Sequence, residues 1–356
     1  MKTIGQYYYK SINGAGGRIK ATPGFEDYNK AFNVRKKYSL GESAPPAILY
    51  DRGDHYYFVG REDFHREGED LAMVRHGFLF PQELFQKAVF GAKLYHFFDI
   101  DDFDCSRDPF EDDKPLPGVN RIHVPEKACG FLRPEDVFRQ CRDHSRFVKL
   151  LLYSAVMAIM ENFSIVISCP GLDRDKYEKN AVLFIRSLFA MLPWEWREAL
   201  SFHSCVDDPL AFGHFRICVT PLAIADLPKN NKTFYFDMKD FTVSPDLVIE
   251  QKTRGTLCGD LLYRIWSNKD EKALSAFFYI VHHNRDLFDC GMPKMIQMDA
   301  LCCFFFLTEV GEPYRGAMER ELSRLSKGAS REIILFLAGH LGNREFVKLR
   351  EMLSLS

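Results

Sequence analysis

The sequence lacks the short signatures that most often identify a catalytic or metal site. It contains no Cys-x-x-Cys pair, no His-Glu-x-x-His motif and no Gly-x-x-x-x-Gly-Lys-Ser/Thr loop. These absences leave the common zinc, redox, zinc-protease and P-loop frameworks without support. We therefore predict no metal and no cofactor, and we favour a protein that is not an enzyme.

Excess charge and long apolar runs are also scarce. The 47 Lys and Arg residues nearly balance the 49 Asp and Glu residues, so the net charge is only −2. No overall field favours nucleic acid or an anionic membrane as a partner. The longest apolar run, Leu150 to Met160, is shorter than the roughly 20 residues that cross a bilayer, and it predicts a buried helix. No secretory signal is expected at the start of the sequence.

Aromatic residues and cysteines, in contrast, are plentiful. The 356 residues suffice for two or three domains, and 32 Phe predict a thick aromatic core. Several of the ten Cys lie in apolar runs such as Leu301 to Phe306. We interpret them as reduced thiols that act as small hydrophobes in a cytoplasmic protein.

Residues 1–98 predict an aromatic-rich α+β module. Asn13 to Gly17 has the composition of a turn between strands. Strands are expected at Thr3 to Lys10, Ala47 to Tyr50, His55 to Val59, Met73 to Phe80 and Leu94 to Phe98. Helices are expected at Phe25 to Tyr38 and Gln82 to Phe90.

Three further segments follow. Residues 99–133 are dense in Asp, Glu and Pro and predict an exposed loop or linker. Residues 134–243 alternate helical and strand patterns, which predicts a second α+β module. Residues 244–356 lose the strand signal and predict an all-helical C-terminal domain of antiparallel helices. The expected fold class is therefore α+β, with N-terminal mixed α/β modules and antiparallel strands before the helical domain.

In the second module, helices are expected at Pro134 to Asp143, Phe147 to Met160 and Asp173 to Met191, with strands at Ser164 to Ser168, Leu200 to Ser204, His214 to Thr220 and Thr233 to Asp237. In the C-terminal domain, helices are expected at Leu257 to Trp266, Glu271 to His282, Lys294 to Leu307, Ala317 to Leu325, Arg331 to Leu341 and Arg344 to Leu353.

Three short segments have both a chemical and a structural interpretation. Gly14 to Arg18 could cradle a phosphate, but a strand rather than a helix is expected after it, which favours a tight turn. Asp99 to Asp104 lacks the Gly and Glu that complete a calcium loop, which favours a solvated acidic loop. His282 and His283 would point about 100° apart on a helix, which favours a surface role over a shared metal.

A cysteine hydrolase remains an alternative. Such an enzyme needs a thiolate, a His base and an orienting Asn or Asp that meet in space. Cys205 or Cys169, with His203 or His76, supplies the residue types. His203 and Cys205 would share one face of a strand, where buried Cys is common, so structural roles are favoured.

Arg61 and His76 are the polar residues of greatest interest in the first module. A His that enters an apolar strand needs a hydrogen-bond partner, and the preceding loop could supply it. A structural hydrogen bond is favoured over a ligand site. The ligand-site alternative is nucleotide sensing through Arg18, Arg61 and His76.

These residues also carry a family resemblance. The motifs are Gln6-Tyr7-Tyr8, Gly16-Gly17-Arg18-Ile19, Gly24-Phe25, Pro46-Ala47-Ile48-Leu49-Tyr50, Gly60-Arg61 and His76-Gly77-Phe78-Leu79, together with Leu188 to Pro193 and Arg197 to Phe202. In this order they resemble bacterial GTPase-associated proteins, which accompany GTPases in NTP-dependent conflict systems. The resemblance spans about the first 240 residues. Where that family has a Gly-Arg-x-Gly-Asn-like turn before the His, this sequence has Arg66 to Asp70.

The resemblance implies an adaptor or regulatory role beside an NTPase, and it transfers no catalytic residues. We therefore expect a non-enzymatic interaction protein whose partner is a GTPase or another NTPase of a bacterial defence system. A cysteine hydrolase and a nucleotide-sensing domain stay open as alternatives.

Overall fold

A computed structural model describes residues 3–25, 44–53, 55–83, 100, 102–122, 144–210, 215–247, 257–284 and 294–354 of the chain. These residues form a mixed β-sheet in the N-terminal part and mostly helices in the C-terminal part, which confirms the α+β prediction. The predicted helix Pro134 to Asp143 and the predicted strand Leu94 to Phe98 lie outside the described residues, as do most of the predicted helices Phe25 to Tyr38 and Gln82 to Phe90.

The chain divides into two compact units. Residues 1–132, 164–190 and 198–242 belong to the first unit, and residues 133–163, 191–197 and 243–356 belong to the second. The segment 134–243, expected as one module, is therefore shared between the units. Its first described helix, α3 (His144–Glu161), belongs to the helical unit because it packs on α7 (Leu257–Ser267) and forms the ion pair Lys149–Asp260.

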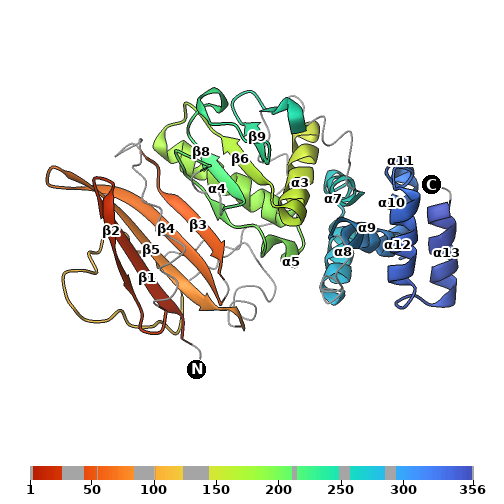
Figure 1. The fold of residues 1–356 in the computed structure, drawn as a ribbon, viewed down its shortest axis with the longest axis horizontal. Helices are drawn as coiled ribbons and strands as arrows, with labels where there is room; N and C mark the ends of the chain where they lie inside the picture. Colours follow the sequence, from red (N-terminus) through yellow and green to blue (C-terminus); the bar gives the residue numbers. More distant parts are fainter. Residues whose placement is uncertain are drawn as a thin grey trace. The chain divides into compact units, whose positions relative to one another are not determined.

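One sheet organises the first unit (Figure 1). Its strand order is β10-β9-β6-β8-β7-β3-β4-β5-β1-β2. The strands are β1 (Gly5–Ile12), β2 (Ala15–Ala21), β3 (Ala47–Arg52), β4 (Tyr56–Glu67), β5 (Asp70–Pro81), β6 (Ser164–Ser168), β7 (Phe202–His203), β8 (Ile217–Thr220), β9 (Thr233–Asp237) and β10 (Thr242–Val243).

The half of the sheet that contains β1 to β5 is antiparallel. Asn13 and Gly14 both have positive φ values, 50° and 69°, as a two-residue hairpin turn of the primed type requires. The turn between β1 and β2 is thus shorter than expected, and Gly16 and Gly17 lie in β2. The longest hairpin is β4–β5, which stays in register from Tyr56 opposite Pro81 to Glu67 opposite Asp70.

A pair of glycines makes room for an aromatic ring within the β4–β5 hairpin. Gly60 and Gly77 face each other across the two strands. A Cβ atom at Gly60 would lie 2.5 Å from the Phe58 ring, and one at Gly77 would lie 2.2 Å from it. The ring therefore needs two adjacent residues without side chains, and Tyr7 packs edge-on against it at 5.7 Å between centroids.

The other half of the sheet is mostly parallel, and β7 links the two halves. It pairs with β3 in the antiparallel sense and with β8 in the parallel sense. Helix α4 (Arg174–Ala190) packs on this region, because the Tyr177 hydroxyl donates to the Ser204 carbonyl at 3.1 Å and Phe189 contacts Tyr50 edge-on. The strands predicted at Ser164 to Ser168 and Thr233 to Asp237 are confirmed as β6 and β9.

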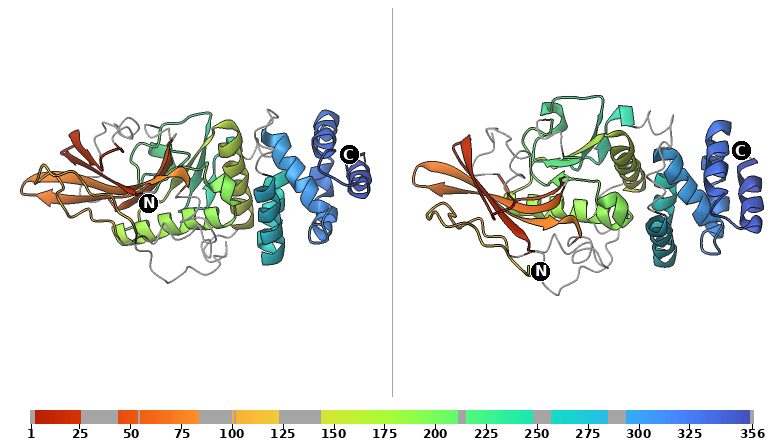
Figure 2. Two further views of the ribbon diagram at one scale, coloured as in Figure 1. Left: turned by 90° about the horizontal axis from the view of Figure 1, so that it is seen from below. Right: turned by 60° about the horizontal axis from the view of Figure 1, so that its bottom comes forward.

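The second unit is a stack of helices (Figure 2). After α3 and α5 (Trp194–Arg197), its helices are α7, α8 (Glu271–His283), α9 (Lys294–Phe306), α10 (Glu312–Ala317), α11 (Glu319–Leu322), α12 (Lys327–Leu337) and α13 (Asn343–Ser354). An aromatic core joins α5, α8 and α9 through Trp196, Phe277 and Phe305. The helix expected at Ala317 to Leu325 is instead split between α10 and α11 at Met318.

Candidate functional site: the strap on the N-terminal sheet

An extended segment, residues 102–119, lies against the sheet of the first unit and is called the strap below. Apart from an isolated bridge between Ile4 and Val119, it forms neither helix nor strand. Leu116 of the strap is only 3% exposed and packs in a small apolar cluster with Tyr8 and Val74. Residues 102–119 form the expected loop, and this part of the predicted loop or linker packs on the sheet as part of the first unit.

The strap covers a face of the sheet on which the predicted site residues gather. The strand register places Tyr8, His76 and Arg61 in one row across β1, β5 and β4. Lys10 and Arg18 form the next row on the same face of β1 and β2, because side chains two residues apart on a strand point to the same side. Arg18, Arg61 and His76 therefore share one face of the sheet.

His76 is buried and binds the strap through its ring. It is 2% exposed, and its ring stacks on Tyr8 with 4.1 Å between centroids. Its Nδ1 atom accepts a hydrogen bond of 2.8 Å from the backbone N–H of Asp104. Burial lowers the pKa of His76 to about 4. The ring is therefore neutral at pH 7, which is the state that the bond to Asp104 requires.

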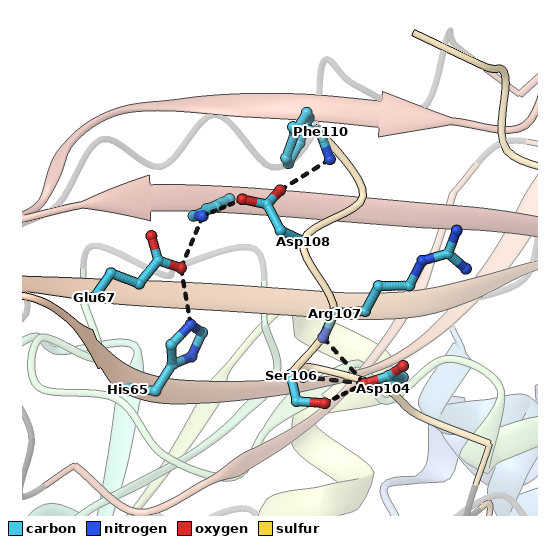
Figure 3. Close-up of polar contacts among 8 residues, drawn as sticks. His65, Glu67, Asp104, Ser106, Arg107, Asp108 and Phe110 are labelled. Carbon is cyan, nitrogen blue, oxygen red and sulfur yellow. Dashed lines mark hydrogen bonds and ion pairs between the residues drawn. The ribbon is translucent and has the colours of Figure 1, made fainter. Parts of the chain in front are cut away.

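Lys10 joins the strap to the β4–β5 hairpin through two carboxylates, those of Asp108 and Glu67. Figure 3 shows these two carboxylates beside His65 and the strap residues. The Nζ atom of Lys10 lies 2.5 Å from Asp108 and 2.8 Å from Glu67, and Glu67 also contacts His65 at 3.0 Å. Burial opposes the charge of Lys10, but its hydrogen bonds to Asp108 and Glu67 outweigh this effect and raise its pKa. The hydrogen bond from Lys10 is in turn the main cause of the lowered pKa of Glu67.

The basic residues of β2 hold the middle of the strap. Lys20 donates to the carbonyl oxygens of Pro109 at 2.5 Å and Asp112 at 2.7 Å. The guanidinium of Arg18 lies 4.6 Å from the centre of the Phe110 ring, which is a cation–π distance. The acidic composition of the strap thus complements the basic side chains on this face of β1 and β2.

Arg61 contacts both the strap and α4. Its Nη2 atom lies 3.1 Å from Glu178 of α4, and its carbonyl oxygen accepts the Cys105 thiol at 3.4 Å. The next residue on the same face of β4, Asp63, pairs with Arg174 of α4 at 2.5 Å. Arg18, Arg61 and His76 thus each contact another part of the first unit, and their contacts hold the strap and α4 on the sheet.

The structure brings Cys205 and His203 together but buries both. The Cys205 N–H donates to His203 Nδ1 at 3.2 Å. Burial raises the pKa of the Cys205 thiol well above its ordinary value, and burial also raises the pKa of Cys169 to about 12. A cysteine nucleophile needs a lowered pKa, so this geometry favours structural roles for both thiols.

A buried ion pair lies on the opposite face of the same strands. Arg75 of β5 donates to Glu62 of β4 from Nε at 3.0 Å and from Nη2 at 2.6 Å, and the two side chains are 4% and 1% exposed. His203 Nε2 lies 3.9 Å from the other Glu62 oxygen, which is too long for a hydrogen bond. The pair is a structural feature that links the two longest strands.

The remaining predicted sites have ordinary partners. The Asp104 carboxylate accepts from the backbone N–H groups of Ser106 and Arg107, both at 3.1 Å, and so shapes the strap. His282 contacts Glu195 at 2.6 Å. Within the described ranges, no group of three or more His, Cys, Asp or Glu side chains could hold a metal ion. Of the helices described, none combines the length and apolarity that crossing a bilayer requires.

Lys10 and Lys20 are the site residues that sequence reasoning missed. Together with Arg18 they form an alternating basic pattern on β1 and β2, and the strap is acidic. These two complementary charge patterns were the sequence feature that could have revealed the contact between the strap and the sheet. Comparison with known proteins adds no assignment, because no family model and no curated protein matches the chain.

Proposed function

We propose that this protein is a non-enzymatic adaptor that binds a protein partner, and that the partner is a GTPase or another NTPase of a bacterial conflict system. The choice of an NTPase rests on the resemblance of motifs such as Gly16-Gly17-Arg18-Ile19 and His76-Gly77-Phe78-Leu79 to GTPase-associated proteins. The adaptor role rests on the surface of the helical unit.

The observation that carries the proposal is the exposure of three large apolar side chains. Tyr279 of α8, Leu335 of α12 and Val347 of α13 are 63%, 65% and 54% exposed. Among the residues that the structure describes, the remaining exposed large hydrophobic side chains are Ile12 and Leu172 of the first unit, which reach only 39% and 37%. Exposed apolar side chains that gather in one patch mark interaction surfaces, and the proposal takes these three side chains to contribute to such a surface.

The contacts of the predicted site residues also favour an adaptor over an enzyme. His76 contacts the strap, Arg61 contacts Glu178, and Arg18 stacks on Phe110. Each of these side chains therefore has a structural task in the first unit. The buried thiols of Cys169 and Cys205, with their raised pKa values, point in the same direction.

The test is affinity purification of the full chain from its native host, followed by reconstitution with the purified partner. We expect a GTPase or another NTPase to co-purify and to bind the chain directly. The double substitution Leu335→Asp and Val347→Asp should weaken that binding about tenfold, which corresponds to a combined loss of about 1.4 kcal/mol of binding free energy.

The matched control is Leu172→Asp, which changes an exposed apolar residue of the first unit and should leave binding unchanged. Recovery of no protein partner would contradict the adaptor role. A partner without NTPase activity would contradict only the NTPase part. A rise in melting temperature with GTP, GDP or ATP alone would favour nucleotide sensing instead, because a ligand that binds only the native state stabilises it.

A further inference from the structure

The helical unit contains a groove between α10–α11 and α13. Its volume is about 670 Å³, which lies within the range of roughly 300–1,000 Å³ that is typical of ligand sites. The side chains on one wall come from residues 315–323, and those on the other wall come from residues 348–352. All of them belong to the second unit.

The bottom of the groove is apolar. Leu322 of α11 and Met352 of α13 line it, and they are 4% and 7% exposed. Methionine is unbranched and polarizable, so it adapts to apolar groups of different shapes. This floor suits one aliphatic or aromatic side chain of a ligand.

Cations line both walls. Arg315 and Arg320 lie on one wall and Lys348 on the other. Arg315 forms an ion pair with Glu312 at 3.8 Å, at the upper end of ion-pair distances. Among the described residues, Arg320 and Lys348 have no ion-pair partner. The groove therefore offers positive charge on two sides of an apolar floor.

Two carboxylates limit how much negative charge the groove accepts. Glu319 and Glu351 line it as well, so three cations and two carboxylates leave one net positive charge. A polyphosphate or a nucleic acid would bring several negative charges close to both carboxylates, which is unfavourable. A peptide that combines an apolar side chain with one or two acidic residues fits this distribution better.

We propose that the groove binds a peptide segment of a protein partner. The segment places one aliphatic or aromatic side chain on Leu322 and Met352, and its Asp or Glu residues lie beside Arg320 and Lys348. This inference rests on the proposed adaptor function, and it names the class of segment that the adaptor recognises.

The experiment uses the full chain and a phage library of random 12-residue peptides. We expect the selected peptides to carry Asp or Glu within a few residues of a large apolar side chain. A fluorescein-labelled synthetic copy of the most enriched peptide is then titrated by anisotropy. Arg320→Glu and Lys348→Glu should each weaken its binding about tenfold, whereas Lys272→Glu, an exposed Lys of α8 outside the groove, should leave it unchanged.

Several results would overturn the proposal. In the selection, these results are the absence of enrichment and the enrichment of peptides without acidic residues. In the titration, they are equal peptide affinity for Arg320→Glu, Lys348→Glu and Lys272→Glu, and displacement of the peptide by inorganic triphosphate at constant ionic strength. Unchanged melting temperatures of the variants would show that they fold. If an NTPase partner binds the chain but ignores Arg320→Glu and Lys348→Glu, the groove assignment fails while the adaptor role stands.

Discussion

The backbone N–H of Asp104 donates a 2.8 Å hydrogen bond to Nδ1 of His76. This bond joins the strap to the middle of a twelve-residue strand, β5. It exists only while the ring is neutral, because a protonated imidazole has no acceptor atom. The attachment of the strap is therefore linked to a group that titrates.

The first prediction concerns acid stability. The pKa of His76 is lowered to about 4 in the folded chain, against about 6.5 in an unfolded chain. Because the native state then binds fewer protons, stability is fully present above pH 6.5 and falls as the pH drops toward 4. When the pH is lowered from 7 to 4.5, the free energy of unfolding in urea should fall by about 2 to 3 kcal/mol more in the wild type than in His76→Asn.

The Asn side chain can still offer an acceptor to the Asp104 N–H, but it does not titrate. His76→Phe is the matched control that removes both the acceptor and the titration. It should be less stable than His76→Asn at pH 7, since the N–H of Asp104 then loses the acceptor that His76 provides. Identical pH profiles for the wild type and both variants would exclude His76 as the cause.

The second prediction concerns Lys10. Its replacement by Met removes the cation that Asp108 and Glu67 share. The two carboxylates are about one third exposed, at 30% and 34%, so solvent screens part of their repulsion. We expect the free energy of unfolding, measured with a chemical denaturant, to fall by about 1 to 2 kcal/mol. We also expect faster proteolytic cleavage within the strap.

The double variant Lys10→Met with Asp108→Asn should recover part of this loss, because it removes one of the carboxylates left without a cation. Lys114→Met is a suitable control, since Lys114 is an exposed residue of the strap. If Lys10→Met and Lys114→Met are cleaved equally fast, Lys10 does not fix the strap.

Much of the local structure could be predicted, but the contacts over the sheet could not. The pattern of β-branched and aromatic residues identified β6 and β9 at their observed bounds. The strand predicted to end at Val59 continues to Glu67. Its second half carries charged residues such as Arg61 and Asp63, which are typical of loops. Their partners on α4 are more than 100 residues away, as Asp63 and Arg174 show, and no local pattern reveals such pairs.

The same limit applies to the candidate site. The sequence identified Arg18, Arg61 and His76, and it identified residues 99–133 as acidic. It did not show that the acidic segment lies on the basic face, because Lys10 and Asp108 are 98 positions apart. The groove was missed for a similar reason, since its two walls come from helices separated by α12.

The third prediction tests the cysteine-hydrolase alternative. Burial raises the pKa of the Cys205 thiol above its ordinary value, so little thiolate is present near neutral pH. With a mild alkylating reagent at pH 7.5, the folded chain should label Cys205 and Cys169 only slowly. The urea-unfolded chain is the control and should label both rapidly. Peptide mass spectrometry measures the rates, and fast, selective labelling of Cys205 in the folded chain would favour a nucleophile.

The fourth prediction concerns Asp299 of α9, a buried carboxyl group in the helical unit. It is 5% exposed, and its Oδ1 atom has no hydrogen-bond partner among the described residues. Burial raises its pKa from 3.8 to about 7. The native state then binds more protons than the unfolded state between these values, so this group lowers stability as the pH rises from 4 to 7.

Asp299→Asn removes this titration while keeping the size of the side chain. Its unfolding free energy should exceed that of the wild type by several kcal/mol at pH 8, and the difference should shrink toward pH 4. Glu319→Gln, an exposed carboxyl group of the same unit, should show no such trend. The opposite trend, with Asp299→Asn less stable at pH 8 than at pH 4 relative to the wild type, would mean that the charged form of Asp299 has a favourable partner in the folded unit.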